Sequence, residues 1–179
     1  MFLRDKSSGE IFATNGKFET HTIDWNNDGL MDLVMMDHEG YLAYYERFTN
    51  DKGELLLHPG KRIFECINCS VYNNKNEVVN DSRGLLRLND GVAGASGRRK
   101  ICLADWDCDG MLDLIVDGVN AVLFHGILDE NGKYVFEYCG PMSKTKIAGH
   151  SSCPTVADFN GDGVPELILG AEDGHIYTV

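Results

Sequence analysis

The chain has 179 residues, of which 43% are hydrophobic, so it can build a core and is not an intrinsically disordered protein. Its formal net charge of −12 disfavours nucleic acid as a partner. No run of eighteen apolar residues is present, and the sequence therefore predicts no membrane span.

The first predicted repeat starts with a strand over 19–23 and an acidic loop. The loop, Asp24–Asp32, reads DWNNDGLMD and leads into the apolar run 33–36. Short apolar runs bounded by Asp and Gly are typical of buried strands. A strand over 41–45 follows, and after a turn another over 55–57. This order predicts four short antiparallel strands.

The next segment, 66–99, is predicted to be an insertion. The acidic loops begin at residues 24, 105 and 158, so their starts are 81 and 53 residues apart, and the first interval holds about 28 extra residues. The insertion contains Cys66 and Cys69 in a CxxC spacing, but no second CxxC or histidine pair completes a zinc site. The six cysteines could pair in fifteen ways, among which the sequence does not choose.

A dense cationic cluster ends the insertion at Arg98-Arg99-Lys100. Arginine forks bind carboxylates well, so Arg98 and Arg99 are candidate ligands for an acidic polysaccharide. The alternative is that the cluster bridges acidic loops of the fold itself.

The acidic loop then recurs twice, at Asp105–Asp113 (DWDCDGMLD) and Asp158–Glu166 (DFNGDGVPE). Each copy again stands between a predicted strand and an apolar run, so it joins strand to strand. The strands predicted around these two loops cover 100–104, 114–116, 121–125, 134–136, 154–157, 167–169 and 175–179.

The shared pattern is D-x-[DN]-x-D-G-x-x-[DE], which places oxygen donors at loop positions one, three, five and nine. A main-chain carbonyl at position seven would add another, where side-chain identity is free. Ca²⁺ takes six to eight oxygens. A single Asp/Asn/Gly cluster is usually an ordinary turn, but three in frame favour a metal site. Three Ca²⁺ ions would bring the net charge from −12 to −6.

Position twelve of the loops excludes the EF-hand. An EF-hand needs a bidentate glutamate there and a helix on each side. The three loops have Met35, Val116 and Leu169 at that position, whose side chains cannot bind calcium. Dockerin-like loops are disfavoured for the same reason.

With these loops and strands, the chain resembles the FG-GAP/VCBS repeat family. The resemblance implies an all-β fold of β-propeller blades, each with four antiparallel strands, at 19–65, 100–140 and 150–179. It also implies about three Ca²⁺ ions per chain. The third loop departs from the family pattern at Glu166, where aspartate is usual. The implied ligands are Asp24, Asn26, Asp28, Leu30 and Asp32 in the first loop, Asp105, Asp107, Asp109, Met111 and Asp113 in the second, and Asp158, Asn160, Asp162, Val164 and Glu166 in the third.

Residues 1–18 are predicted to be blade-completing strands. If Val179 is placed before Phe2, the joined sequence aligns without a gap on Tyr41–Glu54. Three blades are too few for a propeller, which typically has four to eight. We therefore expect either a segment of a longer propeller or a homo-oligomer, in which these strands complete a neighbour's last blade.

The leading functional hypothesis is a calcium-binding β-propeller module, which serves as a binding or structural scaffold in a secreted glycan-handling protein. Its ligand would be an acidic polysaccharide or a protein. Extracellular Ca²⁺ sites are weak and would stay empty in a cytosol, which favours a secreted, cell-surface or periplasmic location. The alternative is part of a carbohydrate-active enzyme such as a polysaccharide lyase, with a His or Tyr as base. Calcium-dependent adhesion is a third possibility.

Overall fold

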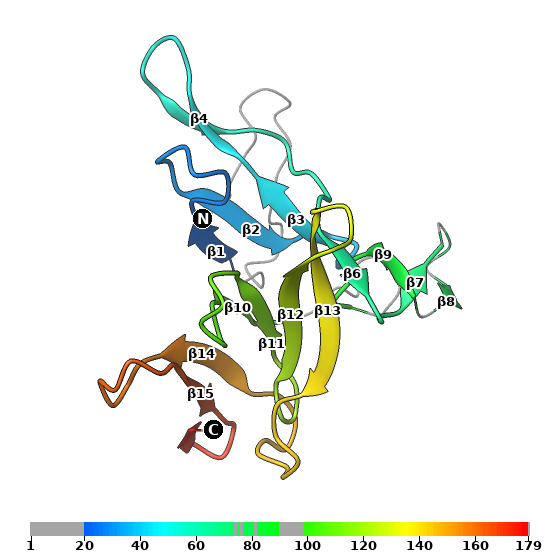
Figure 1. Cartoon of the computed structure of the whole chain (residues 1–179), viewed down its shortest axis with the longest axis vertical. Coiled ribbons are helices and arrows are strands. Elements are labelled where there is room, and N and C mark those ends of the chain that lie inside the picture. Colours follow the sequence, from blue (N-terminus) through cyan, green and yellow to red (C-terminus); the bar gives the residue numbers. More distant parts are fainter. Residues whose placement is uncertain (1–19, 74, 76, 81, 90–98, 179) are drawn as a thin grey trace. The chain divides into compact units, whose positions relative to one another are not determined.

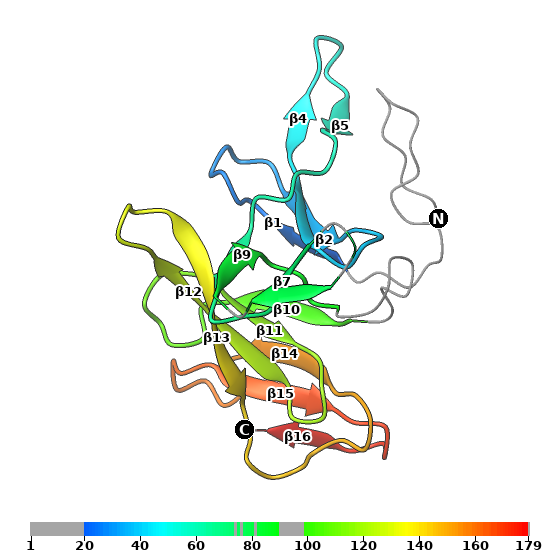
Figure 2. The same cartoon turned by 90° about the vertical axis from the view of Figure 1, so that its right-hand side faces the viewer.

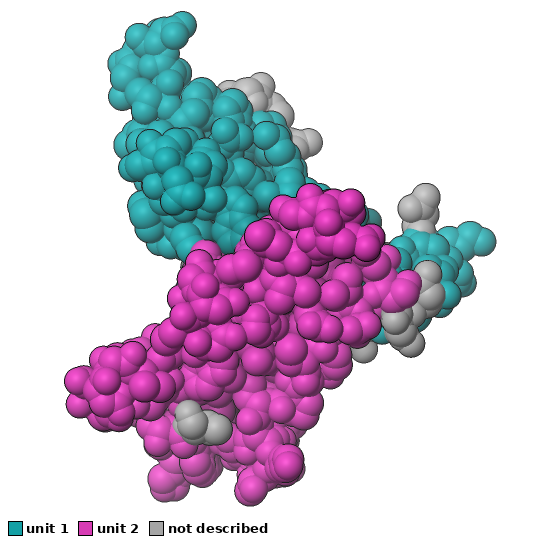
Figure 3. Space-filling view, viewed as in Figure 1, with its two compact units in different colours: residues 1–64, 70–80, 85–99 teal, residues 65–69, 81–84, 100–179 magenta. Residues whose placement is uncertain are grey.

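The computed structural model describes residues 20–73, 75, 77–80, 82–89 and 99–178. Within these residues the chain is all-β, with sixteen strands and no helix. Accordingly, no described helix is long and apolar enough to cross a membrane. The strands predicted at 1–18 lie outside the described residues. The chain divides into two compact units, whose described residues are teal and magenta in Figure 3: unit 1 comprises 1–64, 70–80 and 85–99, and unit 2 comprises 65–69, 81–84 and 100–179.

Unit 1 is built on a three-stranded antiparallel sheet of β1 (Thr20–Ile23), β2 (Asp32–Met36) and β3 (Leu42–Tyr45). Every residue of β3 is buried, and so are four of the five residues of β2. The predicted fourth strand exists as β5 (Leu55–Leu57), but it pairs with β4 (Arg47–Thr49) in a separate hairpin. A core cluster of Met35, Ala43 and Tyr45 is covered by Leu33 and Leu57.

Unit 2 contains the four-stranded antiparallel arrangement that the sequence predicts. The strands β10 (Ile101–Ala104), β11 (Asp113–Val116), β12 (Val122–Leu128) and β13 (Tyr134–Pro141) pair in chain order and lie side by side in Figure 1. β6 (Glu65–Ile67) pairs with β13 in parallel, and β9 (Arg83–Leu85) adds a sixth strand at that edge.

A three-stranded antiparallel sheet follows in the same unit. It consists of β14 (Cys153–Ala157), β15 (Glu166–Gly170) and β16 (Ile176–Thr178), the orange to red strands of Figure 2. Leu167 and Leu169 of β15 pack into one buried cluster with Cys102 of β10 and Ile115 of β11. The two sheets of unit 2 therefore share a core. None of the sheets formed by the described residues closes into a barrel or a propeller.

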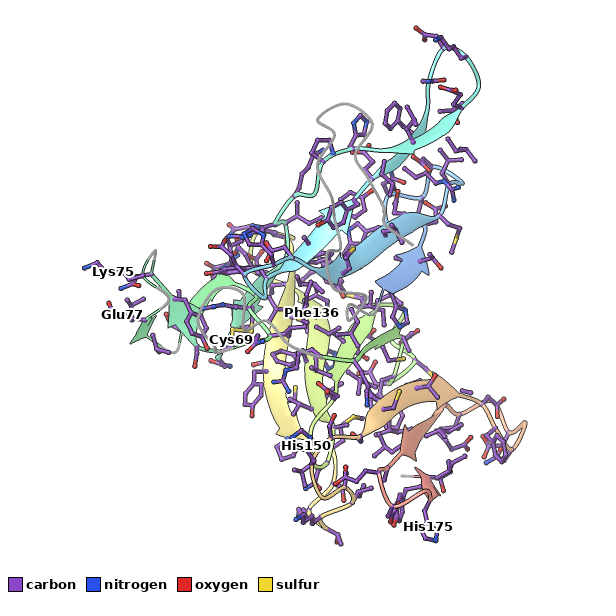
Figure 4. The ribbon with its side chains drawn as sticks, turned by 180° about the vertical axis from the view of Figure 1, so that it is seen from behind. Cys69, Lys75, Glu77, Phe136, His150 and His175 are labelled. Carbon is purple, nitrogen blue, oxygen red and sulfur yellow. A yellow bond between two sulfur atoms is a disulfide. The ribbon has the colours of Figure 1, made fainter. Side chains whose placement is uncertain are left out.

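The segment predicted as an insertion contributes to the sheets rather than forming only a loop. It supplies most of β6, all of β9 and the short hairpin of β7 (Val71–Tyr72) and β8 (Val78–Asn80). Cys66 and Cys69 form a disulfide, which Figure 4 shows beside the label of Cys69. The other four cysteines, Cys102, Cys108, Cys139 and Cys153, are free thiols.

Candidate functional site

Each acidic loop connects two neighbouring antiparallel strands of a sheet. The first joins β1 to β2, the second β10 to β11 and the third β14 to β15. Position nine is also the first residue of the second strand, because Asp32, Asp113 and Glu166 begin β2, β11 and β15. The ladder thus fixes the last acid of each loop, while the other acids depend on the loop's own hydrogen bonds.

Those hydrogen bonds repeat from loop to loop. In the second loop, the Asp105 carboxylate accepts N–H groups from Asp109 and Gly110, both at 3.0 Å. The Asp109 carboxylate accepts the N–H of Met111 at 2.7 Å. The same bonds recur at the corresponding positions of the first and third loops. The side chains at positions one and five are therefore held inside the loop by backbone donors.

Two loop positions need a left-handed backbone. Position six is glycine in every copy, and Gly29, Gly110 and Gly163 have φ of 88°, 89° and 87°. A Cβ at any of them would meet no atom within 4 Å, so glycine is required for its backbone conformation and not for space. Position four is also left-handed, at Asn27, Cys108 and Gly161.

The acids at position nine are the most deeply buried of the candidate metal ligands in each loop. Asp32 is 0% exposed and Asp113 is 1% exposed. Each position-nine carboxylate accepts the N–H of position two, from Trp25, Trp106 or Phe159, at 2.7–3.1 Å. This bond closes the loop back onto the strand.

Asp113 is a buried acid held by two main-chain donors. Its carboxylate accepts N–H groups from Trp106 at 2.9 Å and Gly126 at 2.8 Å, both of them neutral main-chain donors. Burial raises the pKa of Asp113 above its ordinary value, although these hydrogen bonds oppose the rise. A divalent cation in the loop would place positive charge beside this buried carboxylate.

Three groups of side chains in the described residues could hold a metal ion, since their ligand atoms lie within 4.8 Å of one another. Two groups consist of carboxylates alone, and one includes a histidine that the sequence had not singled out. The groups are Asp105, Asp107 and Asp113; Asp107, Asp109 and His125; and Asp158, Asp162 and Glu166.

The acids of the first loop are not among these groups. Asp32 is engaged elsewhere, because it accepts the Tyr44 hydroxyl at 2.8 Å and the Arg47 N–H at 2.7 Å as well as the N–H of Trp25. Burial and the Asp32 carboxylate together raise the pKa of Tyr44, so the phenol remains a donor to that acid. Asn26, the amide at position three, donates to Asp28 at 2.9 Å.

Glu166 also uses its longer side chain within its own loop. One carboxylate oxygen accepts the N–H of Phe159 at 2.7 Å, and the other accepts the Asn160 amide at 2.6 Å. The extra methylene therefore lets Glu166 reach both position two and position three, and the carboxylate still falls in a metal-binding group.

The structure describes only one of the two candidate arginine ligands. Arg98 lies outside the described residues. Arg99 is half-buried, and its Nε donates to the carbonyl oxygen of Leu88 at 2.9 Å. This bond joins Arg99 to the main chain of residue 88 and not to an acidic loop, so it tests neither interpretation of the cationic cluster.

Comparisons with protein-family models, with curated proteins and with solved structures find no match to this chain.

Proposed function

We propose that the chain is a calcium-binding module built from β-propeller blades. The observation that carries the proposal is the threefold recurrence of one loop, with the same donor positions, hydrogen bonds and left-handed residues. The donors are oxygens from carboxylates, from the Asn26 and Asn160 amides and from the position-seven carbonyls of Leu30, Met111 and Val164, as Ca²⁺ prefers. The bound cation neutralises the buried carboxylates and ties the two strands that flank each loop together.

Blade-like packing in unit 2 supports this architecture. β10–β13 form four antiparallel strands, and β14–β16 pack against them through Leu167, Leu169 and Ile115. Neighbouring propeller blades are four-stranded sheets that stack face to face around a centre. The module serves as a scaffold or binding unit in a secreted, cell-surface or periplasmic glycan-handling protein, because weak calcium sites fill only where the ion is abundant.

Thermal unfolding with Ca²⁺ and with chelator tests the metal-binding function. At 10 mM Ca²⁺ and a Kd of about 0.1–1 mM, each filled site adds about 1.4–2.7 kcal/mol to the free energy of unfolding. This corresponds to roughly 3–11 °C in Tm for a chain of this size. Mg²⁺ at equal concentration controls for general charge screening.

Matched variants test whether a particular loop binds the Ca²⁺ that raises the Tm. Asp158→Asn should remove one Ca²⁺ from the stoichiometry measured by calorimetry, whereas Asp51→Asn, at an exposed acid in the β4–β5 turn, should remove none. If chelator leaves the Tm of the wild-type chain unchanged, the calcium assignment is wrong. A parallel screen against polyuronates tests for a glycan ligand. Growth of unsaturated-uronate absorbance would show lyase activity and would contradict the scaffold hypothesis.

A further inference from the structure

His125 lies on the strand that faces the second loop. In the β11–β12 ladder Leu114 is opposite Phe124, which places His125 opposite Asp113, the position-nine acid. Residues directly opposite in an antiparallel pair point to the same face of the sheet. The histidine is therefore directed toward the loop by strand register and not by sequence proximity.

The imidazole reaches two loop carboxylates at a distance typical of ligands that share a metal. His125 Nε2 lies 3.5 Å from Asp107 Oδ2 and 3.6 Å from Asp109 Oδ2. These separations are long for hydrogen bonds. Ligands in a tetrahedral site with bonds of 2.0–2.2 Å are about 3.3–3.6 Å apart. The three ligand atoms also lie within 4.8 Å of one another.

The other two loops have no such nitrogen donor in the described residues. In unit 1, Leu33 is opposite Tyr45, so the residue opposite Asp32 is Glu46, which forms an ion pair with Lys61 at 3.2 Å. The metal-binding group of the third loop contains carboxylates alone. The second loop thus differs from its two copies in donor chemistry, although the loops share one backbone pattern.

We propose that the second loop and His125 form a site for a transition-metal ion of the Zn²⁺ or Co²⁺ class. Ca²⁺ is a hard cation that selects oxygen, whereas imidazole is a ligand for first-row transition metals. Asp107, Asp109 and His125 supply the mixed set, and Asp105 and Asp113 adjoin it through the shared Asp107. The inference rests on the proposed metal-binding function and specifies which metal this one loop selects.

Metal titration of the full-length wild-type chain and of His125→Gln tests the site. The wild-type chain should bind one equivalent of Zn²⁺ or Co²⁺ that excess Ca²⁺ does not displace. In His125→Gln, Zn²⁺ binding should weaken by at least about tenfold. Ca²⁺ binding should remain within about threefold, because oxygen donors dominate its affinity. NMR of the side chains should place the metal-induced shift on the His125 imidazole.

His175→Gln is the matched control. His175, labelled in Figure 4, lies in the β15–β16 turn. Its Nδ1 is 3.2 Å from Asp173 Oδ2, but the residue belongs to none of the metal-binding groups. This variant should bind Zn²⁺ like the wild-type chain. Thiolate-to-cobalt charge-transfer absorption would identify a cysteine site, and if it accounts for the bound Co²⁺ the proposal is wrong.

Three further outcomes would also overturn the inference: no Zn²⁺ uptake, equal affinity in the wild-type chain and His125→Gln, or full displacement by Ca²⁺. These experiments distinguish a failure of the transition-metal inference from a failure of the proposed calcium-binding function. Calcium-dependent melting and loss of one Ca²⁺ in Asp158→Asn would remain even if His125 binds no metal.

Discussion

At the scale of single residues, the fourth loop position shows how one backbone shape limits side-chain choice. Asn27, Cys108 and Gly161 all adopt positive φ there, at 57°, 62° and 78°. Glycine pays no steric penalty in this region, and asparagine tolerates it better than most residues. Cysteine has no such tolerance, so the second loop carries backbone strain that the other two largely avoid.

Cys108→Asn should therefore stabilise the chain. A non-glycine residue in the left-handed conformation costs about 1–2 kcal/mol. Asparagine at position 108 would relieve only part of this strain, so the free energy of unfolding should rise by about 0.5–1 kcal/mol. The shift is about 1–4 °C in Tm, measured by circular dichroism with chelator and reductant present. Cys153→Ser removes another exposed thiol, from β14, and should give no gain. Equal stabilisation by both variants would show that thiol chemistry, not φ, is the cause.

Most of the acidic side chains that meet in the loops could be predicted from spacing alone. Asp105, Asp107 and Asp113 come together because the loop is local, and local hydrogen bonds fix its shape. His125 could not be predicted, because it depends on register. In each of the first two loops a leucine follows position nine. In unit 1 this leucine, Leu33, pairs with Tyr45, twelve residues later, whereas in unit 2 Leu114 pairs with Phe124, ten residues later. The first loop therefore does not give the register of the second.

At the scale of elements, the strands next to the loops match the predicted ranges, whereas the pairing of distant segments was not predictable. β6 comes from about seventy residues before its partner β13 and pairs with it in parallel. Its short sequence, Glu65–Ile67, has no periodicity that would distinguish it from a loop. Non-local pairing of this kind is decided by tertiary contacts rather than by local propensity.

An ion-pair network marks this parallel pairing. Glu65 of β6 forms ion pairs with Lys133, in the turn before β13, and with Arg83 of β9, whose Nη2 lies 2.7 Å from its carboxylate. Arg83 also contacts Asp129 at 2.8 Å. The hydrogen bond from Lys133, followed by that from Arg83, lowers the pKa of Glu65 below its ordinary value.

Glu65→Gln should remove part of the pH dependence of stability. A lowered folded pKa contributes stability that is present above the unfolded value, about 4.3 for glutamate, and lost as the pH falls through the folded value. At pH 7 the variant should lose about 0.5–1 kcal/mol, because the groups are partly exposed. Below the folded pKa it should match the wild-type chain. Urea unfolding from pH 2 to 7, in chelator, measures this difference.

Glu130→Gln is the control for that series, since Glu130 is exposed in the neighbouring turn. Its unfolding free energy should follow the wild-type curve at every pH. A constant loss for Glu65→Gln across the whole range would point to packing instead of charge.

The packing of the two sheets in unit 2 gives a second prediction at this scale. Leu167 is fully buried in the cluster that includes Ile115 and Cys102. Leu167→Ala should lower the free energy of unfolding by about 2–5 kcal/mol, through lost burial and a residual cavity. Ile176→Ala, at a side chain that is 74% exposed on β16, should change it by no more than about 0.5 kcal/mol. Chemical denaturation compares the two, and equal losses would contradict a shared core.

At the scale of the whole molecule, the loops are divided between the two compact units. The first loop belongs to unit 1, whereas the second and third belong to unit 2 and are connected by the buried cluster. Trp106 of the second loop packs on that cluster, and Leu167, the residue after Glu166, lies within it. Metal binding at the third loop should therefore be coupled to the second loop more strongly than to the first.

Hydrogen exchange with Asp158→Asn tests this coupling. In the wild-type chain free of transition metals, Ca²⁺ should slow exchange after all three loops, in β2, β11 and β15, because bound metal stabilises the strands that hold its ligands. In the variant, β15 should lose this protection and β11 should lose part of it through the shared cluster, while β2 should keep it. Measurements of both proteins in chelator separate the lost metal from the lost hydrogen bonds of Asp158. If β2 loses as much protection as β11, the two units unfold as one cooperative body, and the division of the loops has no thermodynamic consequence.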